Sequence, residues 1–172
     1  MSAQANSFIS ELKRAMFMLA ADPRVLFVGQ GVRYDNHKMF ETLAGIPMDK
    51  RLEMPVCEDF QMGFCTGLAL TGRIPICIFP RMDFLLLAAN QLVNHLDKLP
   101  LFGWTPKVII RTAIGAKAPL DAGPQHTQNH TQAFAQMLTS VQVETVSRPL
   151  DVMPLYRDAL ELSKSFLIVE HG

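Results

Sequence analysis

Three segments of the sequence carry side chains that could do chemistry, and the first is EMPVCEDFQMGFCTGLALTGRIPICIF (53–79). Glu58 begins a predicted helix there that contains Gly63 and Gly67. A glycine inside a helix costs roughly 1 kcal/mol relative to alanine, so two of them indicate that something packs closely against this helix. The helix dipole alone also favours a carboxylate in the first turn. Spacing by itself therefore leaves Glu58 open between a functional and a local role.

The second segment is RMDFLLLAANQLVNHLDKL (81–99), a predicted helix that Phe84 opens. Its apolar face carries Leu87, Leu92 and Leu96, as the helical spacing requires. Its mixed face carries amides that need hydrogen-bond partners, namely Asn90, Gln91 and Asn94.

The third segment is GPQHT (123–127), which is followed by His130. His126 and His130 are four residues apart and could share one helical face, a spacing known from metal sites. A structural or catalytic zinc needs at least three protein ligands, and no third ligand has a suitable spacing, so we expect no metal site. Phosphate-binding, dinucleotide-binding and nucleophile-elbow motifs are also absent from the sequence.

Composition narrows the class of protein. The 172 residues suit a single domain over 1–172, and 49% hydrophobic residues can fill its core. Sixteen basic residues balance sixteen acidic ones, which gives no electrostatic reason to expect a nucleic-acid partner or an anionic membrane. The charged N-terminal segment argues against a signal peptide, and three cysteines without metal spacing indicate reduced thiols. We therefore expect a cytoplasmic protein.

Short apolar runs alternate with helical patterns along the chain. The predicted strands are 25–29, 76–79, 107–111, 141–146 and 166–170. The predicted helices are 7–21 (within an N-terminal segment 1–24), 58–71, 83–99, 131–138 and 151–163. This alternation predicts an α/β fold, a three-layer, doubly wound, mainly parallel sheet with helices on both faces. The long loop 112–130 then lies at the carboxyl end of a strand, where such sheets bind ligands.

Taken in order, these segments resemble the beta subunit of the 2-oxo acid dehydrogenase decarboxylases of the pyruvate and branched-chain families. Transketolase shares the GP-x-H loop in its central domain but is less similar in the glycine spacing after Glu58. The resemblance covers about residues 25–171 and includes the closing FLIVEH. The matching positions are Gly63, Gly67, Gly72, Pro75, Asp83, Phe84, Gln91, Asn94, Lys98, Arg111, Gly115 and 123–128.

The resemblance implies the pyrimidine domain of a thiamine-diphosphate-binding fold. It implies that Glu58 hydrogen-bonds a ring nitrogen of the cofactor's aminopyrimidine, and that Phe84 stacks on this ring. Met62 is expected in the same cofactor-binding set. His126 would handle protons or orient a substrate, a 2-oxo acid or a ketose. The three amides of the second segment look more like subunit contacts.

Departures from the family shape the expected partner. The beta subunit has a further C-terminal domain, which we do not expect in this chain, and Thr131 stands where the family usually has an acidic residue. The Gly-Asp-Gly motif that holds diphosphate through Mg²⁺ is also absent. We therefore expect an alpha-type partner chain to hold the diphosphate and Mg²⁺, in a heterotetramer. The alternatives are a split transketolase, a nonoxidative decarboxylase such as sulfopyruvate decarboxylase, and a non-catalytic scaffold or regulatory subunit.

Overall fold

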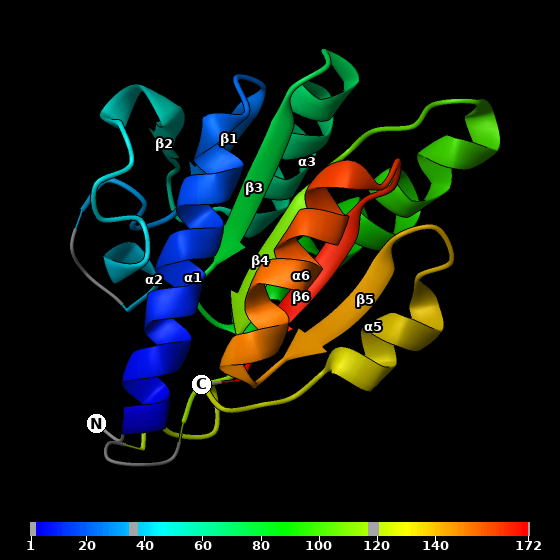
Figure 1. Ribbon diagram of the computed structural model, residues 1–172. Helices are drawn as coiled ribbons and strands as arrows, with labels where there is room; N and C mark the ends of the chain where they lie inside the picture. The colour runs from blue at the N-terminus through cyan, green and yellow to red at the C-terminus, as the bar shows by residue number, and fades with distance from the viewer. Residues whose placement is uncertain (1–2, 35–37, 117–120, 172) are drawn as a thin grey trace.

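A six-stranded, fully parallel sheet forms the centre of the structure, a computed structural model that describes residues 3–34, 38–116 and 121–171 (Figure 1). The strand order is β2-β1-β3-β4-β6-β5. The central strands β3 and β6 are buried along their whole length, as expected for parallel strands covered on both faces. The strands are β1 (Val25–Gly29), β2 (Arg51–Glu53), β3 (Ile74–Phe79), β4 (Ile109–Ala113), β5 (Gln142–Val146) and β6 (Phe166–Glu170).

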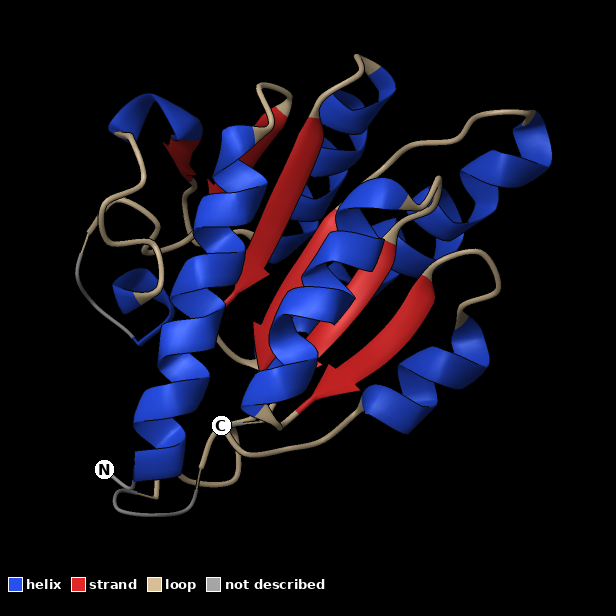
Figure 2. Ribbon diagram, in the orientation of Figure 1, coloured by secondary structure: helices blue, strands red, loops and turns tan. Residues whose placement is uncertain are grey.

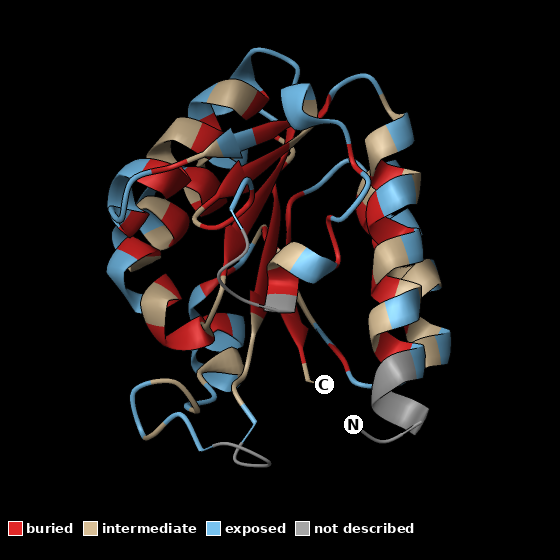
Figure 3. Ribbon diagram, turned by 90° about the vertical axis from the view of Figure 1, so that its left-hand side faces the viewer, coloured by how far each residue is buried: buried red, intermediate tan, exposed pale blue. Residues whose placement is uncertain are grey.

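Helices cover both faces of this sheet, which confirms the predicted three-layer α/β fold (Figures 2 and 3). One face carries α1 (Ala3–Ala21), which packs beside α6 (Pro149–Glu161). The other face carries α3 (Glu58–Leu70) and α5 (Thr131–Met137), with the segment 82–102 between them in sequence. No helix in the described parts of the chain is long and apolar enough to cross a membrane.

The segment 82–102 differs from the single helix predicted over 83–99. It is a series of short helices: α4 (Met82–Leu85), a 3-10 turn η2 (Leu86–Ala88), a π-helical turn η3 (Gln91–His95) and a 3-10 helix η4 (Leu96–Phe102). Tightening and widening of the turns changes which side chains share a face. Leu92 and Leu96 are buried as predicted, but Leu87 is 64% exposed.

The edge strand β2 was not predicted, because its sequence RLE contains one apolar residue. It forms because β1 offers a parallel partner, pairing Phe27 with Arg51 and Gly29 with Glu53. Tertiary pairing thus overrides a weak local preference. The short helices α2 (Lys38–Glu41) and η1 (Met48–Lys50) precede it and were also missed. The strand predicted at 107–111 begins two residues later, at Ile109.

A buried ion pair joins the carboxyl ends of β4 and β6. Arg111 donates from Nε to Oε1 of Glu170 at 2.6 Å and from Nη2 to Oε2 at 3.0 Å. Tyr156 of α6 donates to the same carboxylate at 2.6 Å. Burial raises the pKa of Tyr156 well above its usual value, and the charge of Glu170 adds to this. The network ties α6 to the edge of the sheet where the predicted site residues lie.

Candidate functional site

The strand order creates a switch point between β1 and β3. The connection that leaves β1 contributes Met39 and Leu43 to the core on the α1/α6 face, whereas the connection that leaves β3 packs on the α3 face. Neighbouring strands whose connections leave on opposite faces mark the ligand-binding position of an open parallel sheet, outside the carboxyl ends of the strands. Residues that directly follow β1 and β3 therefore flank the expected binding position.

Glu58 lies beside this switch point. It is the first residue of α3, and only 7% of its surface is exposed. Gln30, the residue after β1, donates from Nε2 to Oε1 of Glu58 at 3.1 Å. The carboxylate is thus held against the end of β1 rather than extended into solvent, so the helix dipole is not its only contact.

Glu53, the last residue of β2, fixes the loop that carries Gln30. Its carboxylate accepts hydrogen bonds from the backbone N–H groups of Gly31, Val32 and Arg33 at 2.6, 2.9 and 2.8 Å. Charge-assisted bonds of this kind are among the stronger hydrogen bonds in proteins. The turn after β1 is therefore braced from the neighbouring strand, which gives Gln30 a defined position.

The body of α3 is tied to the sheet one turn after Glu58. Gln61 is fully buried and donates from Nε2 to the carbonyl of Ile78 at 2.9 Å. A Cβ on Gly63 would lie 3.3 Å from Oε1 of Gln91, which confirms close packing at this glycine. Gly67 is different, because among the described residues nothing lies within 4 Å of the position its Cβ would take. Within the described chain, the predicted close packing is therefore not found at Gly67.

Phe84 and His126 come together although they are 42 positions apart in the sequence. Their rings meet edge to face, with centroids 5.5 Å apart and an interplanar angle of 88°. Asp83 accepts a hydrogen bond from Gln128 Nε2 at 2.9 Å, and Met82 Sδ accepts one from the backbone N–H of His130 at 3.3 Å. The turn after β3 and the loop after β4 are thus joined at several points.

The long loop predicted at 112–130 runs from the end of β4 to α5, and residues 117–120 of it lie outside the described residues. Two parts of this loop approach each other closely at Gly115. A Cβ on Gly115 would lie 2.1 Å from the carbonyl oxygen of His126 and 3.3 Å from Nε of Arg81. Only a glycine lets these two parts of the loop approach. The same contact places Arg81 beside the histidine loop.

Met62 and the amides of the second segment form no hydrogen bond with the carboxylate of Glu58 in the described part of the chain. Met62 has no exposed surface and packs in the core on the α3 face, so it lies behind Glu58 rather than on an open surface. Asn94 donates to Asn90 Oδ1 at 3.0 Å, and Gln91 donates to Asp59 Oδ2 at 3.2 Å. Each of the three amides therefore has a hydrogen-bond partner within the chain.

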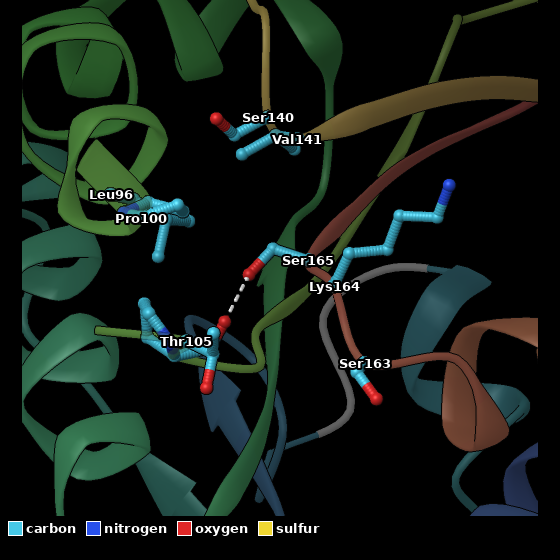
Figure 4. Close-up of a pocket in the computed structure, with 9 residues that line it drawn as sticks. Leu96, Pro100, Thr105, Ser140, Val141, Ser163, Lys164 and Ser165 are labelled. Carbon is cyan, nitrogen blue, oxygen red and sulfur yellow. Dashed lines mark hydrogen bonds between the residues drawn. The ribbon is translucent and has the colours of Figure 1, made fainter. Parts of the chain in front are cut away.

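Three residues of this region escaped the sequence analysis: Gln30, Glu53 and Arg81. Each lies at or just beyond the carboxyl end of a strand, and that position is the signal that could have found them. A hollow in the surface lies away from these residues. It is lined by Leu96, Thr105 and Lys164 among others, from segments that precede β4, β5 and β6, at the opposite edge of the sheet (Figure 4). The described residues include no group of three or more potential metal ligands.

Comparisons with known proteins show which family the chain belongs to. The family described as "Transketolase, pyrimidine binding domain" matches residues 11–171. Pyruvate dehydrogenase E1 component subunit beta-3, chloroplastic, of Arabidopsis thaliana is 30% identical over 156 residues, covering 87% of this chain and 38% of that protein. The E1 component subunit beta of Cyanidium caldarium is 30% identical over 172 residues, covering 95% of this chain and 52% of that protein. The chain thus spans about two fifths to one half of these relatives.

A solved structure shows the same fold. The protein titled "Split gene transketolase, inactive beta4 tetramer" superposes with a TM-score of 0.72 at 19% identity, covering 92% of this chain and 48% of that one. At this identity the likeness concerns the fold alone.

Proposed function

This chain belongs to the family of transketolase pyrimidine-binding domains, and we propose that it is the pyrimidine-binding half of a split thiamine-diphosphate-dependent enzyme. In this proposal residues 1–172 act as one pyrimidine-binding domain. The observation that carries it is the position of Glu58, a nearly buried carboxylate that Gln30 holds at the switch point of the sheet. Its relatives named as pyruvate dehydrogenase E1 beta subunits support the same class of enzyme.

The described residues fit the aminopyrimidine of thiamine diphosphate. Gln30 occupies Oε1 of Glu58, and no described group donates a hydrogen bond to Oε2, which leaves this oxygen for a ring nitrogen. Phe84 is half-buried on α4, which follows β3, and would contact the ring through its π-face. Met62 would support the site from the core. When bound, thiamine diphosphate supplies a carbon nucleophile that attacks a keto group.

His126 is the second catalytic residue of the proposal. Its ring meets Phe84 edge to face, and its Nδ1 is buried without a hydrogen-bond partner among the described residues. An imidazole that is held in place while one nitrogen remains unused can accept or deliver a proton, or orient a substrate oxygen. We assign this role to His126, with a 2-oxo acid or a ketose as the substrate.

A partner chain of alpha type completes the proposed enzyme by holding the diphosphate and Mg²⁺, in a heterotetramer. The absence of a Gly-Asp-Gly motif supports this division of labour. An uncovered apolar surface also supports it: Phe60 on α3 is 52% exposed, Leu87 is 64% exposed, and Gly67 has open space above it. Large exposed apolar patches commonly mark protein interfaces.

The free thiols Cys57, Cys65 and Cys77 favour a reducing compartment such as the cytoplasm.

The substitution Glu58→Gln tests the catalytic proposal in the complex of this chain with its partner. Because the carboxylate acts on the step that creates the nucleophile, we expect kcat to fall by roughly 100-fold or more while the complex still forms. Steady-state turnover and size-exclusion chromatography measure these two properties.

Glu161→Gln is the matched control, since Glu161 is an exposed carboxylate at the end of α6. It should leave kcat unchanged. Unaltered turnover in Glu58→Gln would contradict the catalytic role and would favour a scaffold or regulatory subunit.

A further inference from the structure

Several buried polar atoms without a partner belong to the end of β4 and to the segments that follow β3 and β4. Seven buried side-chain nitrogen or oxygen atoms in the described residues lack a hydrogen-bond partner, and five of them lie here. They are Arg81 Nε, Asp83 Oδ2, Thr112 Oγ1, His126 Nδ1 and His130 Nε2. A buried polar atom without a partner costs about 1–3 kcal/mol. Such a concentration therefore indicates a place where a ligand supplies the missing partners.

Arg81 is the positively charged group of this cluster. Its guanidinium has five N–H donors, yet among the described residues it makes a single hydrogen bond, from Nη1 to the carbonyl of Pro80 at 2.8 Å. No carboxylate among the described residues lies within 4 Å of it. The neighbouring Arg111 differs, because Glu170 neutralises it. Arg81 thus keeps both a charge and several donors uncommitted.

The position of Arg81 connects it to the proposed reaction. It lies three residues before Phe84, on the segment that follows β3 at the switch point. Its Nε approaches Gly115, whose backbone N–H donates to the carbonyl of His126 at 3.1 Å. The guanidinium therefore borders the loop that carries the proposed proton-handling residue.

We propose that Arg81 binds the negatively charged group of the substrate, a carboxylate or a phosphate, and so selects anionic keto compounds. This inference rests on the proposed function and adds a specificity-determining residue to it. A planar guanidinium matches the two oxygens of a carboxylate or phosphate and forms paired, charge-assisted hydrogen bonds with them.

Asp83 is the nearby acid that could compete for Arg81. Its Oδ1 is bound by the side chain of Gln128, and its carboxylate forms no ion pair with Arg81. Asp83 therefore helps to hold the loop after β4 and leaves the guanidinium available to a ligand.

Arg81→Gln and Arg81→Lys in the complex with the partner chain test the proposal by kinetics. We compare pyruvate, its neutral methyl ester and fructose 6-phosphate as substrates. For Arg81→Gln we expect KM for the anionic substrate to rise roughly 10- to 100-fold, with KM for the neutral ester unchanged. Arg81→Lys keeps the positive charge but loses the planar pair of N–H donors, so its KM for the anionic substrate should lie between those of wild type and Arg81→Gln. Which of the two anions shows the effect distinguishes carboxylate from phosphate recognition.

Calorimetric titration of the same complexes with pyruvate and with inorganic phosphate provides a second measurement that needs no turnover. Wild type should bind one of these anions at least tenfold more tightly than Arg81→Gln, whereas Arg157→Gln, at an exposed arginine on α6, should match wild type. Equal anion affinity in Arg81→Gln and wild type overturns the proposal. A parallel loss for the charged and neutral substrates also overturns it. Failure of the proposed function looks different, because it removes turnover of all substrates and leaves these anion affinities intact.

Discussion

At the scale of single residues, Gln30 shows how a neutral amide can define the geometry of a carboxylate. It donates to Glu58 at 3.1 Å and is itself placed by the loop that Glu53 binds through three backbone N–H groups. In this arrangement Gln30 binds Oε1 of Glu58, and this hydrogen bond also fixes the orientation of the second carboxylate oxygen, Oε2. Positioning of this kind matters because a displacement of about 1 Å can cost roughly 100-fold in rate.

The substitution Gln30→Met tests this positioning role. Methionine has a similar length and no hydrogen-bond donor, so Glu58 loses its contact without loss of volume. We expect kcat of the complex to fall roughly 10- to 100-fold with KM for the substrate little changed. Steady-state kinetics measures both constants.

Gln136→Met, at an exposed glutamine of α5, serves as the control and should behave as wild type. If Gln30→Met retained full kcat, the hydrogen bond to Glu58 would have no positioning role.

Glu58, Phe84 and His126 could be singled out from the sequence, because their residue types and their order along the chain are distinctive. Gln30 and Arg81 could not, because neither has a spacing that sets it apart from an ordinary surface residue. Their roles arise from the switch point, which exists only once the order of the strands is known.

At the scale of elements, Asp97 joins the segment 82–102 to the entrance of β5. Its side chain is fully buried and accepts hydrogen bonds from the backbone N–H groups of Thr139, Ser140 and Val141 at 2.9, 2.7 and 2.9 Å. Burial would raise the pKa of Asp97, but hydrogen bonds from Lys98 and these backbone groups outweigh it and lower the pKa to about 2. Asp97 therefore acts as a clamp between two connections on the α3 face.

The pH dependence of stability follows from this lowered pKa. The contribution of ionised Asp97 is complete above the unfolded-state pKa near 4 and is lost as pH falls toward about 2. We expect Asp97→Asn to lower the free energy of unfolding by about 2 kcal/mol at pH 7 and to reduce its decline between pH 4 and pH 2. Urea denaturation at several pH values measures both.

The exposed Asp158→Asn on α6 is the comparison and should change the urea midpoint little. Coincident unfolding curves for wild type and Asp97→Asn at pH 7 would rule out the clamp.

The elements themselves were predicted where hydrophobic periodicity was strong, as in β6, α1 and α3. The segment 82–102 was not, because its apolar spacing suits an α-helix while its packing selects 3-10 and π turns. Strand β2 was missed because its pairing with β1 is a long-range interaction that three residues do not encode.

At the scale of the whole molecule, the proposed site residues lie along one edge of the sheet, and an uncovered apolar surface lies beside it on α3 and η2. We expect the isolated chain to bind thiamine diphosphate and Mg²⁺ weakly, and the complex with the partner to bind them tightly, because in the proposed enzyme the other chain holds the diphosphate. Isothermal titration calorimetry on both samples measures this. Tight binding by the isolated chain would refute the division of the site between two chains.

A pair of leucine variants tests whether the apolar surface is what the partner covers. Leu87→Lys places a charge at the 64% exposed position beside α3 and should prevent assembly. Leu150→Lys places the same charge at an 88% exposed position on α6, on the opposite face, and should not. If both variants assembled equally well with the partner, the interface would not include Leu87.

The three thiols of this chain differ in accessibility, and this makes the protein suited to selective chemical labelling. Cys57 is exposed and directly precedes Glu58, whereas Cys65 and Cys77 are buried, and burial raises the pKa of Cys65 well above its usual value. Since the thiolate is the form that reacts with alkylating reagents, a maleimide dye should modify Cys57 first. A fluorophore at that position would sit at the entrance of α3 and report when another molecule arrives there.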